Sequence, residues 1–134
     1  IAMSLASEHL QHYETAAKVA SMMIDHLMKD PLPASTILNV NVPDLPFADI
    51  AGFEVTRCGT RHCAEPTIKQ IDPRGHPIYW VGPAGAEEDA GPGADFYAIR
   101  HRQVSITPLR VDLTHYESFD QVASWALGLE HVDG

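Results

Sequence analysis

The first cluster of side chains that could do chemistry is Cys58-Gly-Thr-Arg-His-Cys63, in which two thiols and one imidazole lie within six residues. Thiolates and imidazoles are the usual ligands of zinc, but a structural zinc site needs four of them, in most proteins as two close pairs. The sequence has no second cysteine pair, so His9 and His12 would have to complete the site from far along the chain. The pattern therefore favours two small side chains in a turn at a strand end, where Gly59 permits a tight backbone.

A second candidate is an anion site built from Arg57, Arg61 and Arg74. Guanidinium groups match phosphate oxygens with two parallel hydrogen bonds, which makes arginine the residue of choice for phosphate recognition. Their spacing alone does not bring the three together. Because the chain has 18 acidic against 9 basic residues, each arginine could instead be solvated or paired with a nearby carboxylate.

The glycine-rich segment from Gly82 to Gly93 is not a typical phosphate cradle. It lacks both the G-x-G-x-x-G order and the lysine of a P-loop, and its acidic residues Glu87, Glu88 and Asp89 would repel phosphate. We expect a long flexible loop here, acting as a mobile lid or as an arm that grips a partner subunit.

Ser105, Asp112 and His115 are the residue types of a hydrolytic triad, but no G-x-S-x-G elbow surrounds any serine. Asp112 and Thr114 are instead expected to bond local backbone groups ahead of the last helix. Three further side chains are interpreted as packing residues: His26 as a half-buried histidine, and Trp80 and Trp125 as core or interface aromatics.

Composition limits the classes of function. A chain of 134 residues and 14.7 kDa is one domain or part of one. No apolar run approaches the ~18 residues that cross a bilayer, so we expect no membrane partner. The net charge of −9 argues against binding to a nucleic-acid duplex. Two cysteines are too few for a disulfide scaffold, which predicts the reducing cytoplasm.

The first third of the chain predicts a strand, a helix and a second strand. Residues 1–5 form an apolar run, and a chain that opens inside a buried strand is more often a fragment than a whole protein. Apolar residues at helical spacing predict a helix over 13–29, which Pro31 ends. Residues 37–42 alternate Leu and Val with Asn, the period of a strand. Such a unit is typical of two parallel strands joined by a right-handed crossover in an α/β layer.

The rest of the chain predicts shorter elements. Residues 53–57 and 104–109 indicate strands, with one helical turn over 95–100. Residues 66–71 and 76–81 flank Asp72-Pro-Arg-Gly75, whose Pro and Gly suit a type I turn, so a hairpin is expected. Ser118 followed by Gln121 predicts a capping box for the last helix. The apolar face of that helix comprises Phe119, Val122, Trp125, Ala126 and Leu129.

Six motifs, in this order and over nearly the whole chain, resemble the C-terminal half of proteins of the SurE family. They are Ile37-Leu-Asn-Val-Asn-Val-Pro43, Val55-Thr-Arg-Cys-Gly-Thr-Arg61, Asp72-Pro-Arg-Gly75, Tyr79-Trp-Val-Gly82, Asp89-Ala-Gly-Pro-Gly-Ala-Asp95, and Val104-Ser-Ile-Thr-Pro-Leu109 followed by Asp112-Leu-Thr114. His12-Tyr13 is also similar to the family pattern. One departure is Tyr116, where relatives often have a histidine; here His115 comes one position early.

The resemblance implies a Rossmann-like three-layer α/β fold, extended by a β-hairpin and a C-terminal helix. It also implies a metal-dependent nucleotidase, using Mg or Mn, that releases phosphate from nucleoside 5'- and 3'-monophosphates. In the family an Asp-Asp pair after the first strand, a serine and an asparagine hold the metal, and these motifs are absent here. We therefore expect no catalytic or metal-binding residue in this segment, which alone would be inactive. Arg57 and Arg61 match the family's Thr-Arg-x-Gly motif, which implies substrate binding near the phosphate, with a subunit contact as the open alternative.

The resemblance further implies a complementary N-terminal half and a homodimer or homotetramer, in which the hairpin and the last helix pack between subunits. Residues 1–45 would then belong to the Rossmann-like core, and residues 46–134 to the oligomerisation extension. Two alternatives from other classes remain open: a non-catalytic assembly module that binds a partner through the hairpin and the last helix, and a small zinc-binding domain.

Overall fold

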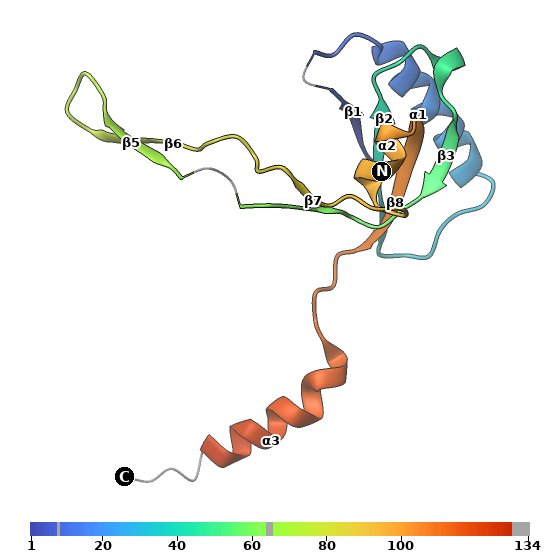
Figure 1. Ribbon diagram of the computed structural model, residues 1–134. Helices are drawn as coiled ribbons and strands as arrows, with labels where there is room; N and C mark the ends of the chain where they lie inside the picture. The colour runs from blue at the N-terminus through green and yellow to red at the C-terminus, as the bar shows by residue number, and fades with distance from the viewer. Residues whose placement is uncertain (8, 64–65, 130–134) are drawn as a thin grey trace.

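A computed structural model describes residues 1–7, 9–63 and 66–129 (Figure 1). Its centre is a four-stranded sheet in the order β1-β2-β8-β3. Strand β1 is parallel to β2, β2 is antiparallel to β8, and β8 is parallel to β3. Helix α1 joins β1 to β2, so the predicted strand-helix-strand unit is confirmed. These elements span Ala2–Ala6 (β1), Tyr13–Leu27 (α1), Thr36–Pro43 (β2), Gly52–Val55 (β3) and Gln103–Arg110 (β8).

The period-two pattern of β2 gives the sheet two different faces. Leu38, Val40 and Val42 point to one face and are buried against Val19 of α1 and Val104 of β8. Asn39 and Asn41 lie between them and point to the opposite face. Because cross-strand partners share a face, the register that pairs Asn41 with Ser105 and Asn39 with Thr107 continues the polar face into β8.

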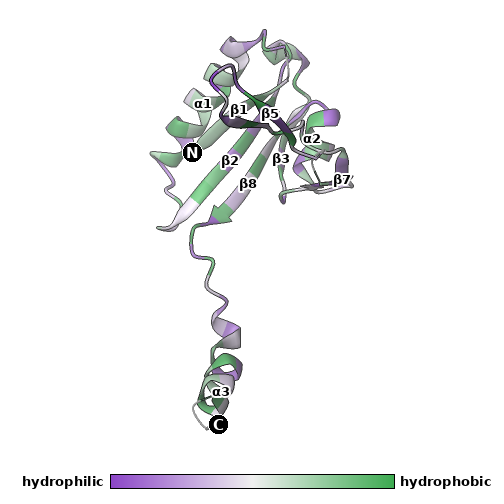
Figure 2. Cartoon of the chain, turned by 90° about the vertical axis from the view of Figure 1, so that its left-hand side faces the viewer, coloured by the Kyte–Doolittle hydropathy of each residue, from purple (hydrophilic) through white to green (hydrophobic). Residues whose placement is uncertain are grey.

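Helix α2 (Asp95–Arg100) covers the polar face, and α1 covers the apolar one (Figure 2). Helix, sheet and helix form three layers, which gives the expected Rossmann-like α/β arrangement. Within the polar face, the Thr56 hydroxyl lies 2.8 Å from the Ser105 hydroxyl and 2.7 Å from that of Thr107. All three residues are buried, so each hydroxyl must find its hydrogen bond inside the protein.

The start of α1 is fixed by Asp44, which follows β2. Its carboxylate accepts hydrogen bonds from the backbone amides of Gln11 and His12, and lies 3.0 Å from Nδ1 of the His12 ring. Partial desolvation opposes ionisation, but these hydrogen bonds outweigh it, and the pKa of Asp44 falls below its ordinary value. The Thr15 hydroxyl also donates to the carbonyl of Leu45.

The helix ends at Leu27, two residues before the predicted end at Lys29.

Beyond β3 the chain forms an arm, defined as residues 60–63 and 66–89. Its outer part is the predicted hairpin, β5 (Ile68–Ile71) paired antiparallel with β6 (Pro77–Trp80). In the turn, Asp72 accepts the backbone amides of Arg74 and His76, and Gly75 adopts φ of 85°. Its inner part is a second ladder, β4 (Thr60–Arg61) paired antiparallel with β7 (Glu87–Asp89). The expectation of a long flexible loop over Gly82–Gly93 is therefore wrong at residues 87–89, which form β7, and the role of an arm that grips a partner subunit stays a prediction.

Helix α3 (Phe119–Leu129) lies away from the sheet, after a 3-10 turn at Tyr116–Ser118 (Figures 1 and 2). Every residue of α3 is exposed. Trp125 keeps 61% of its surface accessible and Trp80, on β6, keeps 59%. Neither tryptophan is a core residue, so the core interpretation is wrong for both, and the interface role stays a prediction.

A second 3-10 turn, Phe47–Asp49, follows β2. Among the described helices none is long and apolar enough to cross a membrane. The sheet takes two strands from residues 1–45 and two from residues 46–134, and the proposed division into two domains stays a prediction.

The buried hydroxyl cluster leads to a prediction of stability. Replacing Thr56→Val removes the common partner of Ser105 and Thr107 while keeping the side-chain shape. Buried hydroxyls left unpaired should lower the free energy of unfolding by about 1–3 kcal/mol. Thr56→Ser, which keeps the hydroxyl and loses one methyl, should cost about 1 kcal/mol or less. Urea unfolding followed by circular dichroism measures both, and an equal loss in the two variants would contradict the role of the hydroxyl.

Candidate functional site

A polar cavity of about 430 Å³ lies where β1 and β2 end, on the sheet face that α2 covers. Ligands of α/β proteins bind beyond the carboxyl ends of parallel strands, and β1 and β2 are such a pair. The cavity lining comes from four places: the end of β1, the polar face of β2, the arm, and α2. The lining residues are Ala6, Ser7, Asn41, Arg61, Glu87, Asp95, Phe96, Ile99 and Arg100.

Arg61 forms one wall of the cavity. Its guanidinium carbon lies 4.7 Å from the centre of the Phe96 ring, and its Nη1 donates to the carbonyl of Gly85 at 3.2 Å. A guanidinium stacked on an aromatic ring keeps its charge and most of its donors available. These two contacts, to a ring and to a carbonyl, hold Arg61 at the cavity and leave its charge unneutralised by either of them.

Gly59 allows Phe96 to support Arg61. A Cβ atom at Gly59 would lie 2.4 Å from the backbone oxygen of Asp89 and 2.5 Å from the Phe96 ring. The Gly59 amide donates to Oδ1 of Asp95, which also accepts the amide of Phe96. The tight backbone predicted at Gly59 is therefore confirmed. It lets Asp89 of the arm and Phe96 of α2 both pack closely against Gly59.

Arg57, the other predicted substrate-binding residue, is not among the residues that line the cavity. Its guanidinium pairs with both carboxylate oxygens of Asp89, with 2.8 Å between Nη2 and Oδ1. This pairing raises the pKa of Arg57 and lowers the pKa of Asp89. The structure thus separates the three arginines: Arg61 at the cavity, Arg57 paired beside it, and Arg74 in the hairpin turn.

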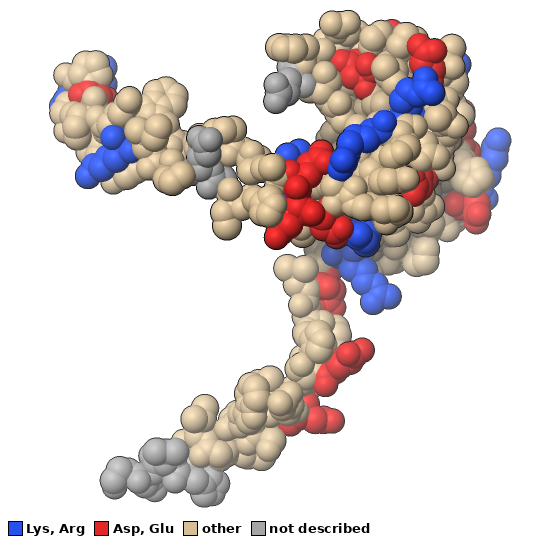
Figure 3. Space-filling model, viewed as in Figure 1, with Lys and Arg blue, Asp and Glu red and all other residues tan. Residues whose placement is uncertain are grey.

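Arg100, at the end of α2, is a cavity residue that sequence reasoning missed. Its Nη2 lies 2.5 Å from Oε2 of Glu87 and donates to the carbonyl of Ala90 at 3.2 Å. The acidic and basic side chains of this region gather where the arm joins the sheet (Figure 3). Phe96 and Arg100 are four residues apart on one helix, a spacing that puts them on the same face and could have indicated their association.

The described residues do not by themselves form a site for a metal ion. No three His, Cys, Asp or Glu side chains of residues 1–7, 9–63 and 66–129 converge as ligands. At the cavity, an Asp95 oxygen accepts two amides and Glu87 holds Arg100. Cys58 and Cys63 are both free and exposed, so the structure gives no support to a zinc site.

The possible triad does not assemble. Ser105 is fully buried in the hydroxyl cluster, and the His115 ring lies 2.6 Å from the Ser118 hydroxyl. Asp112 accepts the Thr114 amide at 2.9 Å and the Tyr116 hydroxyl at 2.7 Å. The interactions with Thr114 and Tyr116 lower the pKa of Asp112. The prediction that Asp112 and Thr114 organise the chain ahead of the last helix is confirmed.

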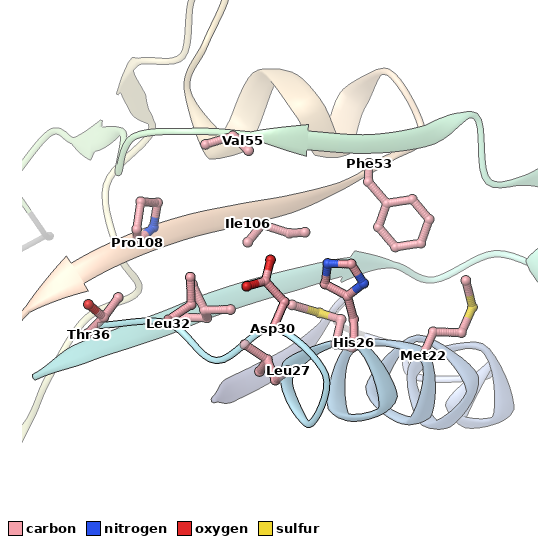
Figure 4. A pocket seen from close by; sticks show the side chains of 12 residues that line it. Met22, His26, Leu27, Asp30, Leu32, Thr36, Phe53, Val55, Ile106 and Pro108 are labelled. Atoms are coloured by element: carbon pink, nitrogen blue, oxygen red, sulfur yellow. The ribbon is translucent and has the colours of Figure 1, made fainter. Parts of the chain in front are cut away.

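A second cavity of about 630 Å³ is an apolar groove on the other face of the sheet (Figure 4). It runs between the end of α1, with Met22, His26 and Leu27, and the sheet residues Phe53 and Ile106. His26 is exposed at its edge, so the prediction of a half-buried histidine is wrong: α1 covers β1 and β2 but leaves Phe53 of β3 open. The groove has the character of a packing surface.

Residues 1–65 match the family model described as "Survival protein SurE". The chain is 68% identical over 130 residues to "5'-nucleotidase SurE" of Coxiella burnetii, covering 97% of this chain and 50% of that protein. It is 57% identical over 129 residues to the protein of the same name from Alkalilimnicola ehrlichii, covering 96% and 50%. The crystal structure of the SurE protein from Aquifex aeolicus matches with a TM-score of 0.72 and 34% identity, over 92% of this chain and 50% of that one. The chain spans about half the length of the curated relatives it matches.

The contact at Gly59 gives a prediction with a matched control. Gly59→Ala forces a Cβ against the Asp89 backbone and the Phe96 ring, and overpacking of this kind typically costs about 1–3 kcal/mol. Gly91→Ala, at a site with no atom within 4 Å of the new Cβ, should change stability by about 0.5 kcal/mol or less. Urea unfolding of both variants tests this, and a Gly59→Ala variant as stable as the control would exclude the close approach.

The Arg57–Asp89 pair predicts a pH dependence. The pKa of Asp89 lies below its ordinary value of 3.8, so the stability it contributes is present above that value and is lost as pH falls through the folded-state pKa. Asp89→Asn should lower stability at neutral pH, and its difference from wild type should shrink at about pH 3. Asp120→Asn, on exposed α3, is the control. A difference that stays constant with pH would contradict the ion pair.

Proposed function

Because the chain belongs to the SurE family, we propose that it is part of a metal-dependent nucleotidase that hydrolyses nucleoside 5'- and 3'-monophosphates to nucleoside and phosphate. The observation that carries the proposal is the polar cavity at the carboxyl ends of β1 and β2, with Arg61 and Arg100 in its walls. The 68% identity to a protein named 5'-nucleotidase SurE supports the same activity.

Arg61 is the residue we propose to bind the phosphate group. A phosphomonoester is a dianion near neutral pH, and guanidinium donors match its oxygens. The Phe96 ring and the Gly85 carbonyl hold the Arg61 side chain at the cavity, so little freedom is lost on binding. Arg57 acts indirectly, because its pairing with Asp89 holds β7, which carries Glu87, against the site.

We propose that the divalent ion, Mg or Mn, is bound by residues outside this chain, in the complementary N-terminal half. Hard divalent ions prefer clustered carboxylate oxygens. The cavity carboxylates are already engaged, Glu87 by Arg100 and Asp95 by backbone amides. This segment alone is therefore inactive in the proposal, and its part is to build the fold and bind phosphate.

Three surfaces favour assembly with other chain segments. Strand β1 is at the edge of the sheet, and an apolar edge strand is normally paired or covered. The hairpin exposes Ile68, Tyr79 and Trp80, although a two-stranded hairpin alone is barely stable in water. We propose that the N-terminal half continues the sheet, and that the hairpin and α3 pack between subunits of a homodimer or homotetramer.

We also propose that the protein is cytoplasmic. Both cysteines are unbridged, which is the usual state of cysteines in that reducing compartment.

The apolar groove and the exposed face of α3 favour a second candidate, a non-catalytic assembly module. In that case the chain would bind a partner through the hairpin and α3, with the groove as a further contact surface, and would hydrolyse no phosphomonoester. The two candidates differ in whether the polar cavity binds a phosphate group.

A nucleotidase assay with added Mg or Mn separates them. The chain of 134 residues should hydrolyse no nucleoside monophosphate, and the polypeptide at its full natural length should do so. In the longer polypeptide, Arg61→Ala should raise KM roughly 10- to 100-fold, since a hydrogen bond to a charged group is worth about 1.5–3 kcal/mol. Arg74→Ala, in the hairpin turn, is the control. Turnover by the short chain, or none by the long one, would contradict the proposal.

A further inference from the structure

Glu87 lies in the polar cavity with its carboxylate on one of the cavity's two cations. Oε2 of Glu87 is 2.5 Å from Nη2 of Arg100, and both residues line the cavity. A carboxylate bound to a guanidinium uses the same donors that a phosphate group would use. The two anions therefore compete for Arg100.

The other charged groups of the cavity have different partners. Asp95 is fixed by the amides of Gly59 and Phe96, and Arg61 is held by a ring and a carbonyl. Within the described residues that line the cavity, Glu87 is thus the carboxylate that neutralises a cation of the proposed phosphate site. The second contact of Arg100, to the carbonyl of Ala90, would survive the departure of Glu87.

The position of Glu87 allows it to move. It belongs to the three-residue strand β7, whose ladder with β4 has an irregular register. Its side chain is 32% accessible and that of Arg100 is 54% accessible, so water can hydrate the carboxylate once it leaves Arg100. Asp89, two residues further along β7, is paired with Arg57, so β7 would stay in place if the Glu87 side chain left Arg100.

We propose that Glu87 is an internal competitor for the phosphate group at Arg100, displaced when a phosphomonoester or inorganic phosphate binds. This role rests on the proposed function for its substrate, but it concerns a different residue and a different quantity, the affinity of the site. Glu87 weakens the binding of substrate and of the product phosphate alike. It sets the affinity of the site for phosphate groups and is not a catalytic residue.

The expected size of the effect is modest. An exposed ion pair changes an equilibrium by at most about fivefold. Glu87→Gln, which keeps the side-chain length and can still hydrogen-bond, should therefore tighten the binding of inorganic phosphate about two- to fivefold. KM for a nucleoside monophosphate should fall by a similar factor.

The test uses the polypeptide at its full natural length and inorganic phosphate as the probe. Isothermal titration calorimetry gives the phosphate Kd for wild type, Glu87→Gln, Arg100→Gln and the double variant. Glu88→Gln is the matched control, since Glu88 is the next residue on β7 and faces His62 at 3.8 Å. Glu87→Gln should tighten phosphate binding in the wild-type background and have no effect when Arg100 is already replaced.

Three results would overturn the inference: no tightening in a folded Glu87→Gln variant, the same tightening in Glu88→Gln, or the same tightening without Arg100. Either of the last two results would mean that removing any negative charge near the cavity tightens phosphate binding, whether or not that charge pairs with Arg100. If Glu87→Gln fails to fold, Glu87→Asp should give a smaller shift in the same direction. Phosphate binding coupled to Glu87 without any nucleotide turnover would contradict the proposed function alone, and turnover that is indifferent to Glu87 would contradict this inference alone.

Discussion

The strict alternation of apolar and polar side chains along β2 is the constraint from which the two faces of the sheet follow. Leu38, Val40 and Val42 need an apolar cover, and α1 supplies it. Asn39 and Asn41 need polar neighbours, which β8 supplies through Ser105 and Thr107. A register slip of one residue would exchange the two sets, so the burial of the valines also determines that the cavity lining at Asn41 is polar.

The arm is held to this framework by close contacts and by charge. Gly59 lets the backbone approach Phe96 and Asp89, and the pairs Arg57–Asp89 and Glu87–Arg100 tie β7 to β3's end and to α2. Exposed ion pairs contribute little to stability one by one. Their effect here is positional: Asp89 holds Arg57 beside the cavity, and Glu87 neutralises Arg100 in the cavity wall. The two ion pairs that arrange the charges at the cavity therefore also orient the arm.

Local patterns predicted most of the framework. The Val-Asn alternation of β2, the helical spacing before Pro31 and the turn residues Asp72–Gly75 each fix structure through near neighbours, and all three elements are confirmed. Strand β7 was missed because three acidic residues in a glycine-rich segment have low strand preference, and only the distant β4 makes them a strand.

The site was less predictable than the fold for the same reason. Arg61 was predicted, but its contact with Phe96 and the pairing of Arg100 with Glu87 join residues that are remote or separated by a turn. The exposure of His26 was missed because it depends on what covers β3, which no local pattern encodes. The proposal of nucleotidase chemistry came from the family resemblance, since no three His, Cys, Asp or Glu side chains of the described residues converge as metal ligands.

The position of the two tryptophans has a consequence for spectroscopy. Trp80 is on the hairpin and Trp125 is on α3, and the chain has no other tryptophan. Tryptophan fluorescence therefore originates entirely from the hairpin and from α3. It responds to the polarity of the groups that contact these two elements. A shift in the emission maximum would report the binding of another chain segment or subunit to these elements. Unfolding of the core around Val19, Val40 and Val104 would change the emission maximum little, because neither tryptophan belongs to that core.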